Sequence, residues 1–161
     1  MEIAIIACVA TGNFAIGNKG KLCYRIGDDM KRFRELTLGH PIIMGSNTFR
    51  SLPGGALEGR RNIVLSRSSN DFPGCDVYTS LDEALNSCKD ESIVFIIGGE
   101  KVYKEAINLA DTLYITEVYD TPVDCDVFFP SYYSDFECKE RTYLYGNDLR
   151  YEFTKYVRVA D

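Results

Sequence analysis

The sequence predicts an α/β fold: a single domain with a central, mixed, mostly parallel eight-stranded sheet, about four flanking helices and antiparallel strands near the C-terminal end. Short apolar runs alternate with amphipathic segments, which is typical of a largely parallel sheet covered on both faces. After about residue 120, prolines and aromatic residues precede an alternating run. No linker or repeat divides the 161 residues, so one domain over 1–161 is expected.

Six apolar runs have the length expected of buried strands, and they lie at residues 3–10, 41–45, 62–66, 76–78, 93–97 and 112–118. Two further strands are predicted at 136–142 and 151–159, in the Tyr- and Phe-rich region that would close the sheet. Together these segments supply the eight strands.

Helices are expected between the runs. One is read from Ile26 and ends at Gly39, because glycine readily adopts the left-handed conformation that follows many helices. Ser80 and Glu83 form a capping-box pattern for a helix that runs to about residue 89. Another helix begins at Glu100, after a pair of glycines.

Composition excludes several classes of protein. The net charge is −6, whereas general nucleic-acid and membrane binders need a basic surface. Glu2 stands where a signal peptide has a positive charge, and the first apolar run ends by Ala10, too short for a membrane span. The six cysteines are scattered, with no C-x-x-C pair and no histidine in ligand spacing, so no metal site is expected. We therefore expect a reduced, cytoplasmic protein.

The most informative residue is an acid at an apolar position. In a helix read from Ile26, the core-facing positions are Ile26, Asp29, Met30 and Phe33, whereas Asp28 points to water. A carboxylate against an apolar wall is desolvated, and its pKa rises unless a ligand or partner satisfies it. Asp29 is therefore a candidate proton donor or ligand anchor, and the alternatives are a helix cap or one half of an ion pair.

Two strand-to-helix junctions have glycines that let the backbone approach a phosphate closely. They are Gly45-Ser46-Asn47-Thr48 and Gly98-Gly99-Glu100-Lys101. Arginines at both ends of the strand at 62–66 offer positive charge for an anion, in Arg60-Arg61 before it and Ser66-Arg67 after it. Of these, Arg61 is interpreted as a surface residue.

Other polar and aromatic features are interpreted as structural. His40 is the only histidine and lies in a turn, so a hydrolase mechanism that needs a histidine base is not expected. The tyrosines at 132–133 and at 143 and 145 are interpreted as core and edge-strand packing rather than a stacking platform.

Taken together, these residues resemble those of the dihydrofolate reductase family over nearly the whole chain. The segments that carry the resemblance are Ile16-Gly17, Asp29 with Phe33, Pro41 to Gly45, Thr48-Phe49, Gly59 to Arg67, Ile96 to Gly99, Tyr103, Thr116 and Asp126 to Pro130. Their order and spacing make the match specific. The resemblance implies an enzyme that reduces 7,8-dihydrofolate to 5,6,7,8-tetrahydrofolate with NADPH and supports one-carbon and thymidylate metabolism.

The resemblance also implies a substrate site. Asp29 would bind the amino-pyrimidine edge of the pterin and favour protonation of its ring nitrogen, with support from Thr116. Arg60 would bind the α-carboxylate of the glutamate tail. The walls of the pocket would be Ile6, Cys8, Met30, Phe33, Leu52 and Leu57, and the catalytic group would also include Leu22 and Tyr24.

For the cofactor, the resemblance implies contacts along three segments. The nicotinamide would lie beside Ala7, Ile16, Gly17, Asn18 and Ile97, with Tyr103 near it. The pyrophosphate and its ribose would be held by Gly45, Ser46, Thr48, Gly98, Gly99, Lys101 and Val102, with a cis peptide between the paired glycines. The adenosine end would meet Leu65, Ser66 and Arg67, the last two receiving the 2′-phosphate that distinguishes NADPH from NADH.

The segment 10–24 would form a mobile lid that excludes water from the cofactor. Cys23-Tyr24 departs from the Pro-Trp of many bacterial members, and Ser46 stands where many members have arginine. Lys101 and Arg67 are expected to compensate for that missing charge, and Leu22 is an ordinary variant. The implied partners are dihydrofolate and antifolates, and the implied state is a monomer.

Two other functions remain open at the level of sequence. The reductase of riboflavin synthesis shares the scaffold and cofactor, but it would require neither Asp29 in this setting nor Arg60. A noncatalytic pteridine- or dinucleotide-binding protein, or a structural subunit, would be favoured by loss of Asp29, Thr116 or a phosphate junction. All of these are present.

Overall fold

The computed structural model describes residues 1–146 and 148–160. Within these ranges the main sheet has eight strands, in the spatial order β10 (Phe136–Gly146), β11 (Leu149–Arg158), β8 (Thr112–Val118), β1 (Glu2–Ala10), β7 (Ile93–Gly98), β4 (Ile42–Gly45), β5 (Asn62–Leu65) and β6 (Cys75–Tyr78). Five neighbouring pairs are parallel, and the two pairs that involve β11 are antiparallel. The predicted mixed, mostly parallel sheet is confirmed; of the domain predicted over 1–161, residues 147 and 161 lie outside the described residues.

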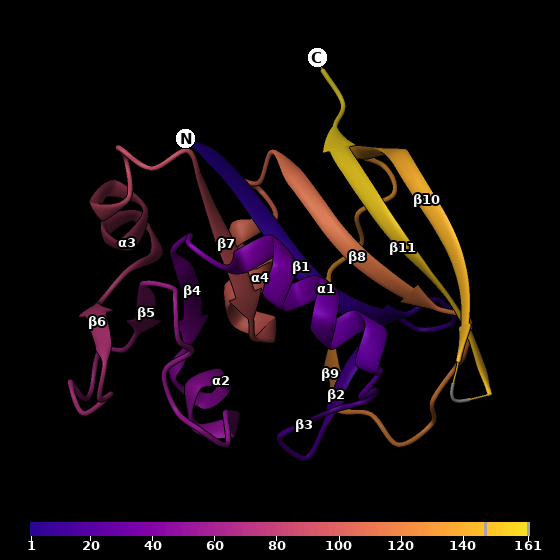
Figure 1. Ribbon diagram of the computed structural model, residues 1–161, viewed down its shortest axis with the longest axis horizontal. Coiled ribbons are helices and arrows are strands. Elements are labelled where there is room, and N and C mark those ends of the chain that lie inside the picture. The colour runs from indigo at the N-terminus through magenta and orange to yellow at the C-terminus, as the bar shows by residue number, and fades with distance from the viewer. Residues whose placement is uncertain (147, 161) are drawn as a thin grey trace.

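The strand β1 lies inside the sheet, between β7 and β8, and its side chains alternate between two cores (Figure 1). Ile5 and Val9 face one core, against the helices α3 (Leu81–Ser87) and α4 (Glu100–Ala106). Ala4 and Ile6 face the other core, against α1 (Gly27–Thr37) and α2 (Ser46–Ser51). The four helices of the described residues therefore cover both faces of the sheet.

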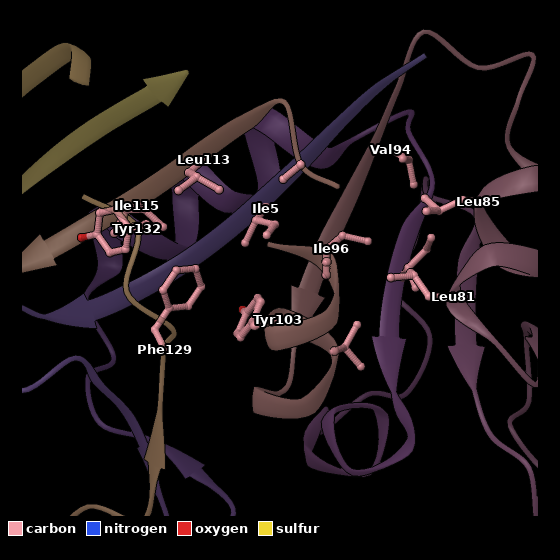
Figure 2. Close-up of a cluster of buried hydrophobic side chains, with 14 of the residues drawn as sticks. Ile5, Leu81, Leu85, Val94, Ile96, Tyr103, Leu113, Ile115, Phe129 and Tyr132 are labelled. Atoms are coloured by element: carbon pink, nitrogen blue, oxygen red, sulfur yellow. The ribbon is translucent and has the colours of Figure 1, made fainter. Parts of the chain in front are cut away.

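Aromatic rings fill the core beneath α4. The ring of Tyr103 packs on Phe129 with centroids 4.9 Å apart, and Phe129 packs on Tyr132 at 5.6 Å. Figure 2 shows these rings near Ile5 and Ile115, which come from β1 and β8. Tyr132 is fully buried, which confirms its interpretation as a core residue.

The helix α1 begins one residue later than predicted, because Ile26 is its N-cap, and it ends at Thr37. Asp28 and Asp29 lie in its first turn, where negative charge is favourable. Gly39 follows the C-cap with a φ of +84°, and its N–H donates to the carbonyl of Gly59 at 2.8 Å. The predicted glycine stop is confirmed.

One half of the capping box predicted for α3 is present, whereas the Glu83 carboxylate accepts from the Thr79 hydroxyl at 2.9 Å in place of the Ser80 N–H. The Ser80 hydroxyl accepts from the Glu83 N–H at 3.1 Å. The helix α3 ends at Ser87 rather than near residue 89, because Cys88 and Lys89 continue as turns bonded to Leu85 and Asn86. In the C-terminal hairpin, both strands differ from prediction, since β10 extends to Gly146 and β11 starts at Leu149.

The segment 10–24 was predicted to be a mobile lid loop, but it is not wholly a loop. It contains β2 (Ala15–Asn18) and β3 (Lys21–Leu22), which form a second sheet with β9 (Val127–Phe128). The strands β2 and β3 form a local hairpin, whereas the pairing of β2 with β9 joins residues more than 100 positions apart, so the local sequence carries little signal for that pairing. These short strands tie the segment to the region just after β8 (Figure 1).

Two hydrogen bonds fasten α1 to the last strand of the main sheet. The Tyr151 hydroxyl donates to Asp28 Oδ2 at 2.9 Å, and Arg32 Nη2 donates to the Thr154 carbonyl at 2.9 Å. The prediction that Asp28 only faces water is therefore incomplete: it is exposed, but it also accepts this bond. Among the residues described, no helix combines the length and apolar character needed to cross a membrane.

Candidate active site

Asp29 turns its carboxylate from the first turn of α1 toward β8. The hydroxyl of Thr116, which is 1% exposed, donates a 2.5 Å hydrogen bond to Asp29 Oδ1. Burial raises the pKa of Asp29 above its ordinary value of 3.8; the Thr116 hydrogen bond and the positive charge of Arg32 oppose this rise without cancelling it. The predicted inward orientation of Asp29 and its association with Thr116 are present.

Residues of β1 and α4 surround this pair. Cys8 lies opposite Thr116 in the β1–β8 register, and burial and the charge of Asp29 raise the pKa of its thiol. The Tyr103 hydroxyl donates to the Ile6 carbonyl at 2.9 Å, and burial, Asp29 and Cys8 raise the pKa of Tyr103. Groups predicted for the pterin and groups predicted for the nicotinamide are thus brought together around β1.

Several predicted wall residues share one apolar cluster. Phe33, Leu52 and Leu57 pack against the buried core that includes Ile6, and so does Ile97, which was predicted for the nicotinamide. These side chains come from α1, the segment after α2 and β7. The structure therefore brings together the predicted apolar walls on the α1 side of the sheet.

Two of the predicted apolar site residues are largely exposed. Met30 is 53% exposed and Leu22 is 61% exposed. The interpretation of Met30 as a core-facing position is wrong, because its side chain is half exposed and belongs to none of the buried clusters of the described residues. Any role of either residue at a ligand remains a prediction.

Arg60 lies beside a hollow of about 350 Å³ that is also lined by Arg34 and Leu57. Its guanidinium is fixed by hydrogen bonds to the Glu58 carbonyl at 3.0 Å and to the buried Thr37 hydroxyl at 3.1 Å. Burial and the neighbouring charge of Arg34 lower the pKa of Arg60. In the part of the chain that the structure describes, no carboxylate forms a salt bridge with either arginine. Two cations beside a hollow suit an anionic group.

Arg61 has a different environment from its neighbour. Its Nε donates to Asp76 at 2.7 Å, and its Nη2 donates to the Tyr78 hydroxyl at 3.1 Å. These partners raise the pKa of Arg61 despite partial burial. Arg61 holds β5, β6 and the end of α3 together, so its interpretation as a surface residue is incomplete.

The two glycine junctions touch each other. A Cβ on Gly98 or on Gly99 would lie 3.3 Å from Thr48 Oγ1, and a Cβ on Gly45 would lie 3.4 Å from Val102 Cγ2. The peptide between Gly98 and Gly99 is cis, as predicted. The absence of side chains leaves both backbones open for close approach, so this cradle fits a pyrophosphate.

The predicted adenosine-end residues adjoin this cradle. Leu65 pairs with Gly45 in the β4–β5 register, which places Ser66 and Arg67 just beyond the same edge of the sheet. The Ser66 hydroxyl accepts from the Ser69 N–H at 3.3 Å, and Arg67 is exposed. Ser46 is the first residue of α2 and Lys101 is the second residue of α4, the two helices on either side of the cradle.

The predicted lid residues lie on the second sheet. Ile16 and Gly17 are buried on β2, Asn18 is half-buried at its end, and Ala7 is half-buried on β1. The Tyr24 hydroxyl donates to Asp120 at 2.7 Å, and burial and this bond raise the pKa of Tyr24. Tyr24 thus joins the lid segment to the residues after β8.

Sequence reasoning missed Arg32, which lies three residues after Asp29 on α1. Its guanidinium stacks over the Phe153 ring at 4.7 Å, and its Nη1 is the one buried side-chain polar atom without a partner among the described residues. Burial lowers the pKa of Arg32, against the charge of Asp29. The i, i+3 spacing between Asp29 and Arg32 could have indicated that the two charges lie near each other on α1.

The sequence is similar to that of known dihydrofolate reductases. The family model described as "Dihydrofolate reductase" matches residues 2–158. The chain is 44% identical to a dihydrofolate reductase of Mycobacterium leprae over 121 residues, covering 71% of this chain and 73% of that protein. It is 38% identical to a dihydrofolate reductase of Neisseria meningitidis serogroup B over 163 residues, covering 98% and 99%.

A solved structure agrees with these sequence matches. Dihydrofolate reductase from Enterococcus faecalis, complexed with NADP(H) and RAB-propyl, superposes with a TM-score of 0.88 at 28% identity. The match covers 98% of this chain and 96% of that one. The chain therefore belongs to the dihydrofolate reductase family, a family of NADPH-dependent oxidoreductases.

Proposed function

We propose that this protein reduces 7,8-dihydrofolate to 5,6,7,8-tetrahydrofolate with NADPH, and that Asp29 holds and activates the pterin. The observation that carries the proposal is the Asp29 carboxylate, which faces β8 with Thr116 as its hydrogen-bond donor. A carboxylate has more acceptor sites than one donor can occupy. The remaining sites suit the amino and ring N–H groups of an amino-pyrimidine edge.

Asp29 also assists the protonation of the pterin that accompanies hydride transfer. Its raised pKa makes the carboxyl a better proton acceptor near neutral pH than an exposed aspartate. Negative charge at the pyrimidine edge favours protonation of the pterin ring nitrogen. Thr116 holds the carboxylate in place through a buried hydroxyl, which prevents the acid from rotating toward Arg32 or water.

The remaining substrate contacts follow from the placement of the side chains. Arg60, with Arg34 beside it, would bind the glutamate carboxylate at the hollow. The apolar body of the substrate would contact Ile6, Cys8, Met30, Phe33, Leu52 and Leu57. Leu22 and Tyr24 would close the site from the lid side.

When bound, NADPH supplies the hydride. The glycine cradle, with Ser46, Thr48, Lys101 and Val102, would hold the pyrophosphate end, and Leu65, Ser66 and Arg67 would hold the 2′-phosphate end. The nicotinamide end would lie at Ala7, Ile16, Gly17, Asn18, Ile97 and Tyr103. The buried members of this set exclude water from the reaction.

We further propose that the protein acts in the cytoplasm as a monomer, supplies one-carbon and thymidylate metabolism, and binds antifolates. All six cysteines are free thiols, which accords with a reducing compartment. Gel filtration of the purified protein tests the monomer.

The first experiment follows NADPH absorbance after dihydrofolate is added to purified protein. Fast oxidation that methotrexate inhibits, and that is slower with NADH, is expected. Absence of oxidation despite tight calorimetric binding of both ligands would instead establish a binding protein and contradict the proposed activity.

The adjacent arginines give a matched test of the substrate site. Arg60→Ala is expected to weaken dihydrofolate binding by about 2–5 kcal/mol, because a charged hydrogen-bonded contact is lost, without changing NADPH affinity. Arg61→Ala is the control, since it removes an ion pair with Asp76 away from the hollow. Calorimetric titration measures both, and equal losses for the two ligands with Arg60→Ala would show that its role is misassigned.

A further inference from the structure

Two cysteines from distant parts of the chain meet beside the lid segment. The sulfur atoms of Cys23 and Cys125 lie 3.6 Å apart, although the residues are 102 positions apart in sequence. Cys23 directly follows β3, and Cys125 lies between β8 and β9. All six cysteines lie in the described part of the chain, and this pair is the one whose sulfur atoms are in contact.

The hydrogen bonds at this pair show which of the two thiols donates its proton to the other. Cys125 donates its S–H to the Pro122 carbonyl at 3.6 Å, so the proton between the two sulfurs belongs to Cys23. Burial, the bond with Cys125 and the charges of Asp126 and Asp120 raise the pKa of Cys23 to about 12. Cys23 therefore remains a thiol at neutral pH, and its S–H points at the Cys125 sulfur. Because Cys125 is the acceptor of this bond, we take it as the sulfur that is oxidised first and Cys23 as the sulfur that resolves it.

Small molecules can reach the pair. A hollow of about 350 Å³ is lined by both cysteines together with Leu22, Pro122 and Val123. Val123 is 90% exposed and Leu22 is 61% exposed at its rim. A disulfide has an S–S distance of about 2.05 Å, so the sulfurs need approach by only about 1.5 Å.

We propose that Cys23 and Cys125 form a reversible dithiol–disulfide site whose oxidant is a peroxide. The Cys125 sulfur attacks one peroxide oxygen, the O–O bond breaks, and a sulfenic acid forms as the other oxygen leaves as water. The Cys23 sulfur then attacks the Cys125 sulfur; the S–O bond breaks, an S–S bond forms, and the Cys23 proton leaves with hydroxide as a second water. The two thiols lose two electrons, and the peroxide gains them. A dithiol reverses the reaction by exchange.

The bond would restrain the β2–β3 hairpin. The Asp126 N–H already donates to the Gly17 carbonyl at 3.2 Å, and the Lys19 N–H donates to the Asp126 carboxylate. A covalent link one residue away would fix this edge, which carries Ile16, Gly17 and Asn18. Because these residues are assigned to the nicotinamide, an effect on turnover rests on the proposed function, whereas formation of the bond does not.

The test uses the full chain with Cys138→Ser, which removes an exposed thiol that would cross-link molecules. After hydrogen peroxide treatment at mildly alkaline pH, peptide mass mapping is expected to find Cys23 joined to Cys125, with a loss of two hydrogen masses. Two thiols should disappear from the titration, and dithiothreitol should restore both. Peptides in which these cysteines are unreacted, or are oxidised separately to sulfinic acid, would overturn the proposal.

Serine variants separate the bond from other oxidation. Cys23→Ser and Cys125→Ser should each abolish the mass loss and the oxidant-induced rise in the urea unfolding midpoint, whereas Cys75→Ser should change neither. In the oxidised protein, the Michaelis constant for NADPH or the turnover number is expected to change by about fivefold or more and to recover with dithiothreitol. If the Cys23–Cys125 disulfide forms but the kinetic constants do not change, the disulfide site stands and its proposed effect on catalysis is overturned. If the disulfide forms in a protein that has no reductase activity, only the proposed function is contradicted.

Discussion

The two faces of β8 hold carboxylates in opposite ways. On one face, Thr116 donates to Asp29, and within the described residues no other side chain donates to that carboxylate. On the other face, the adjacent Glu117 accepts from the Tyr132 and Tyr156 hydroxyls at 2.7 Å each. Neighbouring residues of β8 point to opposite faces of the sheet, where Thr116 contacts an acid with one side-chain donor and Glu117 is an acid with several.

The second face also neutralises its charge. Arg141 bridges Glu117, at 2.8 Å, and Glu152, which lies opposite Glu117 on β11. Burial acts to raise the pKa of Glu152, but hydrogen bonds from Arg141 and Tyr119 outweigh it and hold the pKa below its ordinary value. The comparison teaches that burial alone does not mark a functional acid. A better mark is a buried carboxylate whose oxygen atoms are not all used as acceptors by donors of the protein.

The substitution with the largest expected effect is Asp29→Asn, which removes the acid on the Thr116 face of β8. Turnover with dihydrofolate near neutral pH is expected to fall by about 10²–10⁴-fold, because the group that favours protonation of the pterin is lost. Steady-state kinetics measure the loss, and circular dichroism checks that the fold is retained. Unchanged turnover would remove Asp29 from the mechanism.

Arg141→Met should have the largest effect on the other face. Removal of one partner from a buried ion pair leaves Glu117 and Glu152 with uncompensated charge, and a loss of about 3 kcal/mol in unfolding free energy is expected. The value is at the lower end for such pairs because the Arg141 side chain is 38% exposed. Urea denaturation measures it; turnover per folded molecule should stay the same, and a specific loss of turnover would contradict a structural role.

The pH dependence of stability should have opposite signs on the two faces. The folded-state pKa of Glu152 is lowered, so its stabilisation is present above the ordinary value of 4.5 and is lost as pH falls through the folded pKa. Glu152→Gln should therefore cost about 2 kcal/mol at neutral pH, and this cost should shrink in acid.

Asp29 gives the reverse case. Its folded-state pKa is raised, so the stability it adds is fully present below the ordinary value of 3.8 and is lost as pH rises through the folded pKa. Asp29→Asn should consequently be more stable than the parent protein at neutral pH, with the difference vanishing in acid. Urea unfolding at several pH values measures both variants, and the same sign for the two would invalidate the contrast.

The smallest expected effect comes from Arg32. Arg32→Met removes a positive charge that opposes the rise in the pKa of Asp29, so the pH above which turnover declines should move upward. Arg32→Lys should restore the parent profile, and Lys31→Met is the matched control, because Lys31 is exposed and pairs with Glu35. A profile that does not move with Arg32→Met would show that the residue only packs on Phe153.

Features with a local signal were predictable from the sequence. The buried strands, the Ser80 N-cap and the inward turn of Asp29 each follow from periodicity or from a short motif. The close approach of Gly45 to the paired glycines follows from the rule that parallel strands end at one edge of the sheet.

Features made by distant residues were not predictable. The strands β2, β3 and β9 are two to four residues long, and β2 pairs with β9 across more than 100 positions of the chain. The ion pairs of Arg141 and the contact of Cys23 with Cys125 likewise require strand register and loop placement, which no local pattern specifies. Met30 was misplaced because helical periodicity gives the stripe on which a residue lies but not how far the neighbouring elements cover that stripe.

The attachment of α1 to β11 has a consequence for how the protein is made. Every residue proposed to touch a ligand lies at or before Thr116, yet the helix that carries Asp29 is fastened by Tyr151 and Thr154. A ribosome that has completed β8 has therefore supplied every proposed ligand contact, but not the two hydrogen bonds that join α1 to β11. We expect a nascent chain to gain folate turnover only after its C-terminal hairpin has emerged and paired, because that hairpin completes the attachment of the helix that carries Asp29.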